Sequence, residues 1–120
     1  MKRALTLALI ATLFVLSGCN KATRSPETDA LFRAATAGDA DTVRALLASP
    51  GVDINGLDEN WNTPLMQAAR FGHDDVVRAL LIARANVNAR NREGKTALTL
   101  AAAGGHDETV RLLTDAGAPK

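Results

Sequence analysis

The chain repeats itself at an interval of about 33 residues, and this repetition constrains the fold more than any other feature of the sequence. The segments "NTPLMQAARFGHDDVVRALL" from Asn62 and "KTALTLAAAGGHDETVRLLT" from Lys95 are related by a shift of 33 residues. An earlier copy, "DALFRAATAGDADTVRALL" from Asp29, lies 34 residues before the second. Periods of this length are typical of solenoids, in which each copy buries its apolar side only by stacking on its neighbours.

Each copy predicts two short helices joined by a tight turn. Thr63 and Thr96 offer hydroxyl groups as N-caps, Pro64 stands at the first helical position, and Asp29 can cap the first copy. Paired alanines allow neighbouring helices to approach closely, and leucines and valines at helical spacing form an apolar stripe. A glycine stands in each copy where the first helix ends, a position that favours positive φ: Gly38, Gly72 and Gly105.

The repeat resembles the ankyrin repeat. In the central copy the matching residues are Thr63-Pro64-Leu65, Ala68-Ala69, Gly72-His73, Val76-Val77, Leu80-Leu81 and Asn86-Val87-Asn88. The resemblance implies an all-α fold, an ankyrin-repeat solenoid of three stacked helix-turn-helix repeats with protruding β-hairpin-like fingers. The domain is expected over residues 29–118, with repeats at about 29–57, 58–90 and 91–118. The resemblance also implies a monomeric, non-enzymatic module that binds another protein.

Several positions depart from the family pattern. Trp61 stands where the finger normally has glycine, and Met66 replaces the histidine that usually follows Thr-Pro-Leu. Arg84 occupies a helix-ending glycine position that Gly117 fills in the third copy, and it costs on the order of 1 kcal/mol if the backbone is left-handed there. The first copy carries an extra residue within 49–52, which is expected to bulge the connection.

The N-terminal segment has the pattern of a secretory leader. "MKRALTLALIATLFV" begins with two positive charges and continues as an apolar run of about 13 residues, shorter than the roughly 20 residues of a membrane-spanning helix. Leu16-Ser17-Gly18-Cys19 resembles the lipobox of bacterial lipoproteins, which implies cleavage after residue 18 and acylation of Cys19. An ordinary signal peptide with an incidental cysteine, or a short hydrophobic helix, are the alternatives.

This resemblance implies export and attachment to a membrane. Residues 1–18 are expected to be a lipoprotein signal peptide, and the polar residues 19–28 a lipidated flexible tether. Asn20 is not the aspartate that commonly retains such lipoproteins in the inner membrane. We therefore expect a lipoprotein that faces the periplasm, in the outer membrane rather than the inner membrane.

Composition and spacing argue against several other functions. Without Lys2 and Arg3 the mature chain has 12 basic and 13 acidic residues, so no nucleic-acid partner is expected. One cysteine and two distant histidines cannot form a closed zinc site. His73 and His106 share one repeat slot and are interpreted as caps or loop hydrogen-bond partners. No catalytic constellation, cofactor or small-molecule substrate is expected.

A surface for a protein partner remains. In ankyrin proteins the partner usually meets the finger tips and the exposed side of the first helices, and these slots correspond here to Glu59, Asn60, Trp61, Asn62, Arg70, Phe71, Arg90, Arg92, Glu93 and Lys95. Trp61 is either an interface anchor or a residue that packs across its own finger onto the next. The charged residues are either contacts or simply solvated.

The sequence thus favours a lipid-anchored protein-binding module of the bacterial cell envelope, a scaffold or accessory factor. The alternative is a periplasmic inhibitor or immunity protein that blocks a toxic enzyme. The resemblance does not identify the partner, because ankyrin surfaces vary freely between proteins that share the fold.

Overall fold

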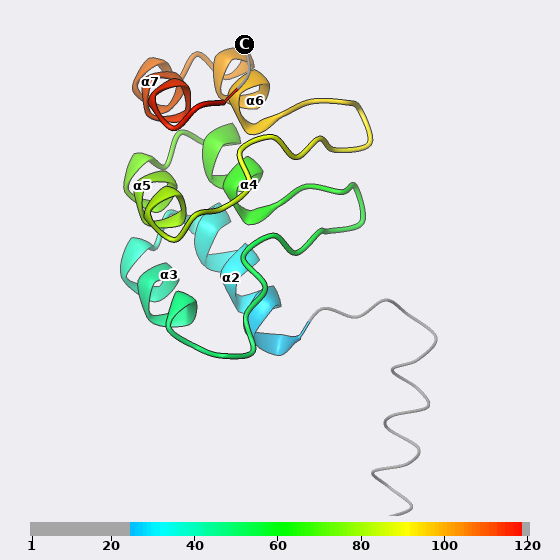
Figure 1. The fold of residues 1–120 in the computed structure, drawn as a ribbon, viewed down its shortest axis with the longest axis vertical. Coiled ribbons are helices and arrows are strands. Elements are labelled where there is room, and N and C mark those ends of the chain that lie inside the picture. The colour runs from blue at the N-terminus through cyan, green and yellow to red at the C-terminus, as the bar shows by residue number, and fades with distance from the viewer. Residues whose placement is uncertain (1–24, 119–120) are drawn as a thin grey trace, which may run out of the picture.

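A computed structural model describes residues 25–118, which form three stacked pairs of helices (Figure 1). The helices are α2 (Pro26–Ala37), α3 (Ala40–Leu47), α4 (Pro64–Arg70), α5 (Asp74–Ile82), α6 (Ala97–Ala103) and α7 (Asp107–Asp115). Residues 25–118 contain no strand, so the all-α prediction is confirmed for them. The expected leader and Cys19 lie outside the described residues. Between residues 25 and 118, no helix is both long enough and apolar enough to cross a membrane.

The helices form two layers. In one layer α4 packs between α2 and α6, and in the other α5 packs between α3 and α7. The loops that follow α3 and α5 project from the side of the first layer (Figure 1). We call them the first finger (residues 48–63) and the second finger (residues 83–96). Both fingers are therefore presented side by side at one edge of the stack.

The core between the repeats is built from small and branched apolar side chains. Leu65, Leu80 and Leu113 are completely buried, and so are the paired alanines Ala68 and Ala69 of α4. Alanines on facing helices let the two backbones approach, so each repeat buries its apolar side against the next. The middle repeat is covered on both sides in this way.

The first helix of each repeat starts with a side-chain cap, in one repeat not the expected residue, whereas α5 and α7 have no side-chain cap hydrogen bond. The hydroxyl groups of Thr63 and Thr96 accept hydrogen bonds from backbone N–H groups three residues later, at 3.2 and 3.3 Å. In the first repeat, however, Ser25 is the cap, and Asp29 lies inside the helix. The prediction of Asp29 as the cap is therefore wrong.

The same observation moves the start of the folded domain. Pro26 occupies the first helical position directly after Ser25, so α2 begins three residues before the expected boundary at residue 29. The Ser25 hydroxyl also donates to the carbonyl of Gly51 at 2.7 Å. The extra residue of the first copy thus lies in a turn that is held against the start of α2, and residues 26–28 are helix and not tether.

The turns between paired helices carry contacts from one repeat to the next. Gly72 has φ 70°, and a Cβ there would lie 2.5 Å from Nδ1 of His106 in the following repeat. His106 Nε2 donates to the carbonyl of Arg70 at 3.0 Å, and His73 makes the equivalent bond to Thr36 at 2.9 Å. The interpretation of both histidines as loop hydrogen-bond partners is confirmed, and each bond links two repeats.

The first repeat uses the histidine slot differently. Asp39 occupies it and caps its own helix, accepting from the backbone N–H of Thr42 at 3.2 Å and from the Thr42 hydroxyl at 2.6 Å. The hydrogen bonds from Thr42 hold the pKa of the Asp39 carboxyl below its ordinary value, because they stabilise the ionised form. With no described repeat before it, this position serves a local cap.

Candidate functional site

The tip of the first finger is a turn organised by one carboxylate. Asp58 Oδ1 accepts hydrogen bonds from the backbone N–H groups of Asn60 and Asn62, both at 2.8 Å. Its Oδ2 accepts from the side-chain amides of Asn62 and Gln67, at 3.2 and 3.3 Å. Three of these bonds fold the finger tip and the fourth joins it to α4, so the tip is a pre-formed loop.

The second finger repeats this turn with an amide and is tied to the first. Asn91 occupies the slot of Asp58, and its Oδ1 accepts from the backbone N–H groups of Glu93 and Lys95. Its Nδ2 donates to Asn62 Oδ1 at 3.0 Å, and the backbone N–H of Arg92 donates to the carbonyl of Asn60 at 3.0 Å. The two tips, residues 58–62 and 90–95, therefore form one continuous surface that we call the finger edge.

One residue expected at this surface is not available to a partner. The side chain of Asn62 lies between Asp58 and Asn91, and Asn62 is only 2% exposed. Its assignment as a contact residue is wrong, because an amide that is buried and bonded on both sides positions the fingers instead. Glu59 and Asn60 are exposed beside it, as expected for contact residues.

Trp61 is the most unusual residue of the finger edge. Its φ of 66° is left-handed, like that of Gly94, which fills the same slot in the second finger with φ 75°. A left-handed backbone costs a residue with a side chain about 1–2 kcal/mol, whereas glycine adopts it freely. Trp61 is nevertheless 51% exposed, so about half of its surface stays available for contact.

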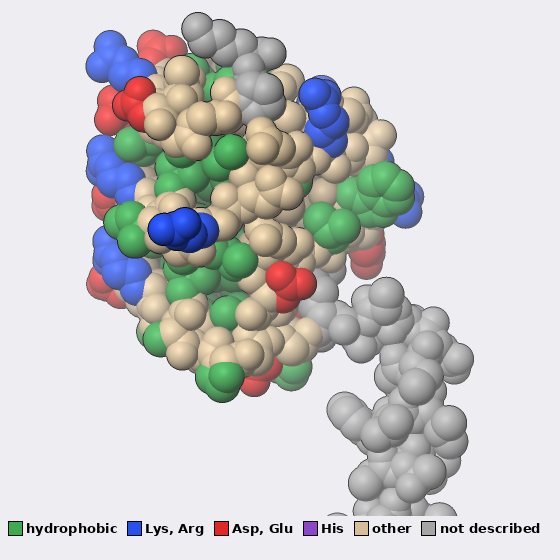
Figure 2. All heavy atoms as spheres, viewed as in Figure 1, with side chains coloured by type: hydrophobic (Ala, Val, Ile, Leu, Met, Phe, Trp, Pro, Cys, Tyr) green, Lys and Arg blue, Asp and Glu red, His purple; other side chains and the backbone are tan. Residues whose placement is uncertain are grey.

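The ring of Trp61 also meets the second finger. The guanidinium carbon of Arg92 lies 5.5 Å from the ring centroid, which is a cation–π contact. At an exposed site such a contact contributes about 0.5–1 kcal/mol, no more than the backbone strain of Trp61. Trp61 therefore packs toward the next finger, which is one of the two alternatives expected for it, and keeps half its surface exposed. Its role as an interface anchor stays a prediction. Figure 2 shows hydrophobic and basic side chains adjacent at the edge where the fingers project.

The other charged residues of the second finger tip make contacts within that finger. Lys95 Nζ lies 3.3 Å from a carboxylate oxygen of Glu93, and Arg90 Nη1 donates to the carbonyl of Gly94 at 3.1 Å. Both contacts are partly solvated, so they contribute little to stability and can be exchanged for contacts with a partner.

The remaining predicted contact residues lie at the end of α4. Phe71 is 49% exposed, and its ring centroid lies 6.2 Å from that of His73. Arg70 is half-buried, and its carbonyl accepts the bond from His106. The positions equivalent to Phe71 in the other repeats hold Ala37 and Gly104, so the exposed aromatic ring is specific to the middle repeat.

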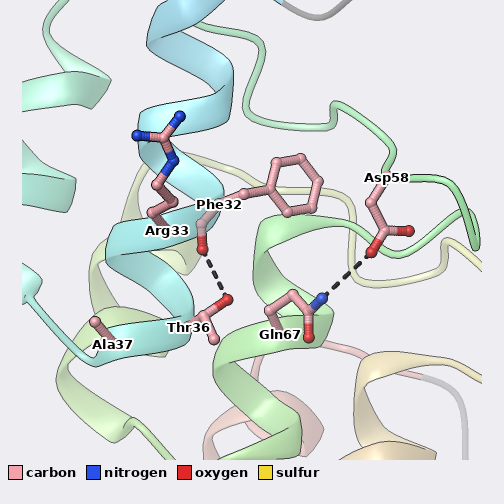
Figure 3. A pocket seen from close by; sticks show the side chains of 6 residues that line it. All are labelled: Phe32, Arg33, Thr36, Ala37, Asp58 and Gln67. Carbon is pink, nitrogen blue, oxygen red and sulfur yellow. Dashed lines mark hydrogen bonds between the residues drawn. The ribbon is translucent and has the colours of Figure 1, made fainter.

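A pocket that sequence reasoning missed lies between α2, α4 and the first finger (Figure 3). Its volume is about 420 Å³, and it is lined by Phe32, Arg33, Thr36, Ala37, Asp58 and Gln67. Figure 3 shows the Phe32 ring directed toward the segment that carries Asp58, whereas Arg33 points away from it. The signal in the sequence is Phe32, the only aromatic residue of the first helix pair, in the slot of Met66.

The outer layer presents a different kind of surface. Arg44 pairs with Asp41 at 3.1 Å, and Arg78 lies 3.2 Å from Asp75 and 3.4 Å from Glu108. Figure 2 shows basic and acidic side chains gathered together along this side. Exposed pairs of opposite charge leave no dominant sign and no aromatic anchor. The finger edge and the neighbouring pocket are thus the better candidates for binding.

This arrangement defines a class of protein. A stack of helix pairs that presents rigid loops, an exposed aromatic residue and a shallow pocket is a repeat solenoid built for protein–protein interaction. The chain belongs to the ankyrin-repeat family, because the family model for ankyrin repeats, in three copies, matches residues 5–91 and 31–120. Members of this family are typically non-enzymatic interaction modules.

Curated relatives match the repeats over part of the chain. Cortactin-binding protein 2 of Rattus norvegicus is 44% identical over 64 residues, which is 53% of this chain and 4% of the relative. The transient receptor potential cation channel subfamily A member 1 homolog of Caenorhabditis elegans is 34% identical over 64 residues, 53% of this chain and 5% of the relative. An ankyrin repeat-containing protein of Schizosaccharomyces pombe is 35% identical over 70 residues, 58% of this chain and 33% of the relative. The chain thus spans a minor part of each of these proteins.

Proposed function

We propose that this chain is a lipid-anchored, non-enzymatic protein-binding module of the bacterial cell envelope, acting as a scaffold or accessory factor. The observation that carries the binding role is the finger edge, where a strained, half-exposed Trp61 lies against Arg92 at a position that needs only glycine. Residues held in such strained backbone conformations are concentrated at binding and active sites. The name of the rat relative, cortactin-binding protein 2, refers to a protein ligand and agrees with a protein partner here.

The envelope location rests on the N-terminal sequence. The charged start, the apolar run and Leu16-Ser17-Gly18-Cys19 support acylation of Cys19 and a periplasmic orientation. Five residues separate Cys19 from Ser25, where the described fold begins, so the six steps of chain between them reach at most about 20 Å. An acylated Cys19 would therefore hold the folded repeats close to a membrane, and Asn20 favours the outer membrane.

Membrane attachment is tested by cell fractionation and mass spectrometry of the full chain. Wild-type protein should partition into detergent with the mass of an acylated Cys19, since several acyl chains together hold a protein firmly to a bilayer. Cys19→Ser should move to the soluble fraction. A Cys19→Ser protein that has lost its leader and still sediments with membranes would contradict the proposed anchor.

Partner binding is tested by crosslinking the full chain in intact envelopes, followed by mass spectrometry of the captured proteins. We expect one or a few proteins that are captured by wild type and lost in a Trp61→Ala, Phe71→Ala double variant with unchanged helical melting. A captured secreted enzyme whose activity is suppressed would favour the inhibitor alternative over a scaffold. Failure of wild type to capture any protein would contradict the binding role.

A further inference from the structure

The cations of the finger edge differ in the contacts that their side chains make within the protein. Lys95 is paired with Glu93, and Arg90 donates to a carbonyl of its own finger. Among residues 25–118, no carboxylate lies within salt-bridge distance of Arg92, whose guanidinium group instead lies near the Trp61 ring. Arg92 is therefore a positioned cation with unused hydrogen-bond donors.

The position of Arg92 suits one chemical group. A guanidinium group beside an aromatic ring has reduced conformational freedom, and the N–H groups along its free side match the two oxygens of a carboxylate. The backbone of Arg92 is fixed as well, because its N–H donates to the Asn60 carbonyl of the first finger. The exposed half of Trp61 adds an apolar wall that lowers the local dielectric and strengthens a charge-assisted bond.

We propose that Trp61 and Arg92 form a receptor for a carboxylate side chain of an acidic segment in the protein partner. This inference rests on the proposed protein-binding function and specifies its chemistry. Arg90 and Lys95 flank the receptor, so the second finger carries three cations and one carboxylate, Glu93, within residues 90–95. The tip of the first finger, residues 58–62, carries two carboxylates, so the finger edge as a whole has no net charge. The cations gathered on the second finger are what orient an acidic segment and fix its register.

The chain contains a single tryptophan, so its fluorescence reports on this site alone. The full lipoprotein is reconstituted in neutral phosphatidylcholine vesicles and titrated with a capped peptide of alternating glutamate and leucine. The matched probe replaces each glutamate with glutamine. We expect a saturable change in Trp61 emission with the glutamate peptide only, weakened by added salt because the contact is ionic.

Variants of arginine separate the receptor from general charge. Arg92→Gln should weaken the glutamate peptide at least about tenfold, the loss expected for a charge-assisted hydrogen bond. The affinity of Arg92→Lys should lie between those of wild type and Arg92→Gln, because lysine keeps the charge but lacks the planar guanidinium group. The matched control is Arg111→Gln on α7, which removes the same charge from the outer layer, away from the finger edge. It should leave the affinity for the glutamate peptide within about twofold.

Several outcomes would overturn the proposal. They are equal binding of the glutamine peptide, equal weakening by Arg111→Gln, or no saturable change with the glutamate peptide. An emission change caused by adding phosphatidylglycerol to the vesicles, without peptide, would assign the site to anionic lipid instead. If crosslinking captures a partner equally well with wild type and Arg92→Gln, the receptor is wrong while the proposed binding function stands.

Discussion

The middle and third repeats have the same backbone conformation but carry different residues at equivalent positions. At two left-handed positions the middle repeat carries Trp61 and Arg84, with φ 66° at each, whereas the third carries Gly94 and Gly117. The middle repeat is packed on both sides, so its backbone is held in these conformations by its neighbours. The third repeat has one packed side within the described residues. Strain is thus tolerated where packing over-determines the backbone.

The largest expected effect comes from removing the third repeat. A chain that ends after Ala89 loses the partners of Asn62, of the Arg70 carbonyl and of Asp74, which are Asn91, His106 and Thr109. Two repeats bury too little shared surface to offset the conformational entropy of folding. We expect the truncated chain to lose cooperative thermal unfolding in circular dichroism. A sharp helical transition in this chain would show that the middle repeat does not need both neighbours.

A matched pair of alanine substitutions measures the contact between repeats. Gly72→Ala should destabilise the protein by about 2–4 kcal/mol, because it adds left-handed strain and displaces the His106 ring from its bond to Arg70. Gly105→Ala has the same strain with nothing within 4 Å of the new Cβ, and should cost about 1 kcal/mol. Urea denaturation gives both free energies. Equal losses would mean that the histidine contact contributes nothing.

How far the sequence anticipates this structure depends on whether a feature repeats. The caps at Thr63 and Thr96 and the left-handed glycine before each second helix occupy equivalent slots, so the period predicts them. The start of α2 was missed because Ser25-Pro26 lies before the aligned copies, although a serine followed by proline is itself a helix-start signal.

Contacts between non-equivalent slots could not be predicted in this way. Asn62 bonds to Asn91, yet Asn91 aligns with Asp58, and Asn62 aligns with Lys95. The register therefore gives no indication that Asn62 is buried between fingers. The contact of Arg92 with Trp61 likewise joins unrelated slots, and depends on how closely the two loops approach. These cross-repeat contacts define most of the candidate site.

Relieving the strain of the middle repeat should stabilise it slightly. Arg84→Gly places glycine where Gly117 stands in the third repeat, and we expect a gain of about 0.5–1 kcal/mol after the greater entropy of unfolded glycine is subtracted. Trp61→Gly should gain less, because it also removes the contact with Arg92. The two variants should differ in crosslinking, since only Trp61→Gly loses the partner. A loss of stability in Arg84→Gly would show that its side chain makes a contact that offsets the strain.

The smallest effect extends the comparison to the first repeat, where Asp39 replaces the histidine of the other two. Its carboxyl has a pKa below the ordinary value of 3.8, so its ionised form stabilises the folded state above that value. This contribution is lost as the pH falls through the lower folded pKa. Asp39→Asn keeps a capping oxygen but does not titrate. On acidification from about pH 5 to below the folded pKa, wild type should therefore lose slightly more thermal stability than Asp39→Asn. The other carboxylates titrate in both proteins, so their contribution drops out of this comparison. Identical losses would show that the charge of Asp39 does not contribute to the stability of the first repeat.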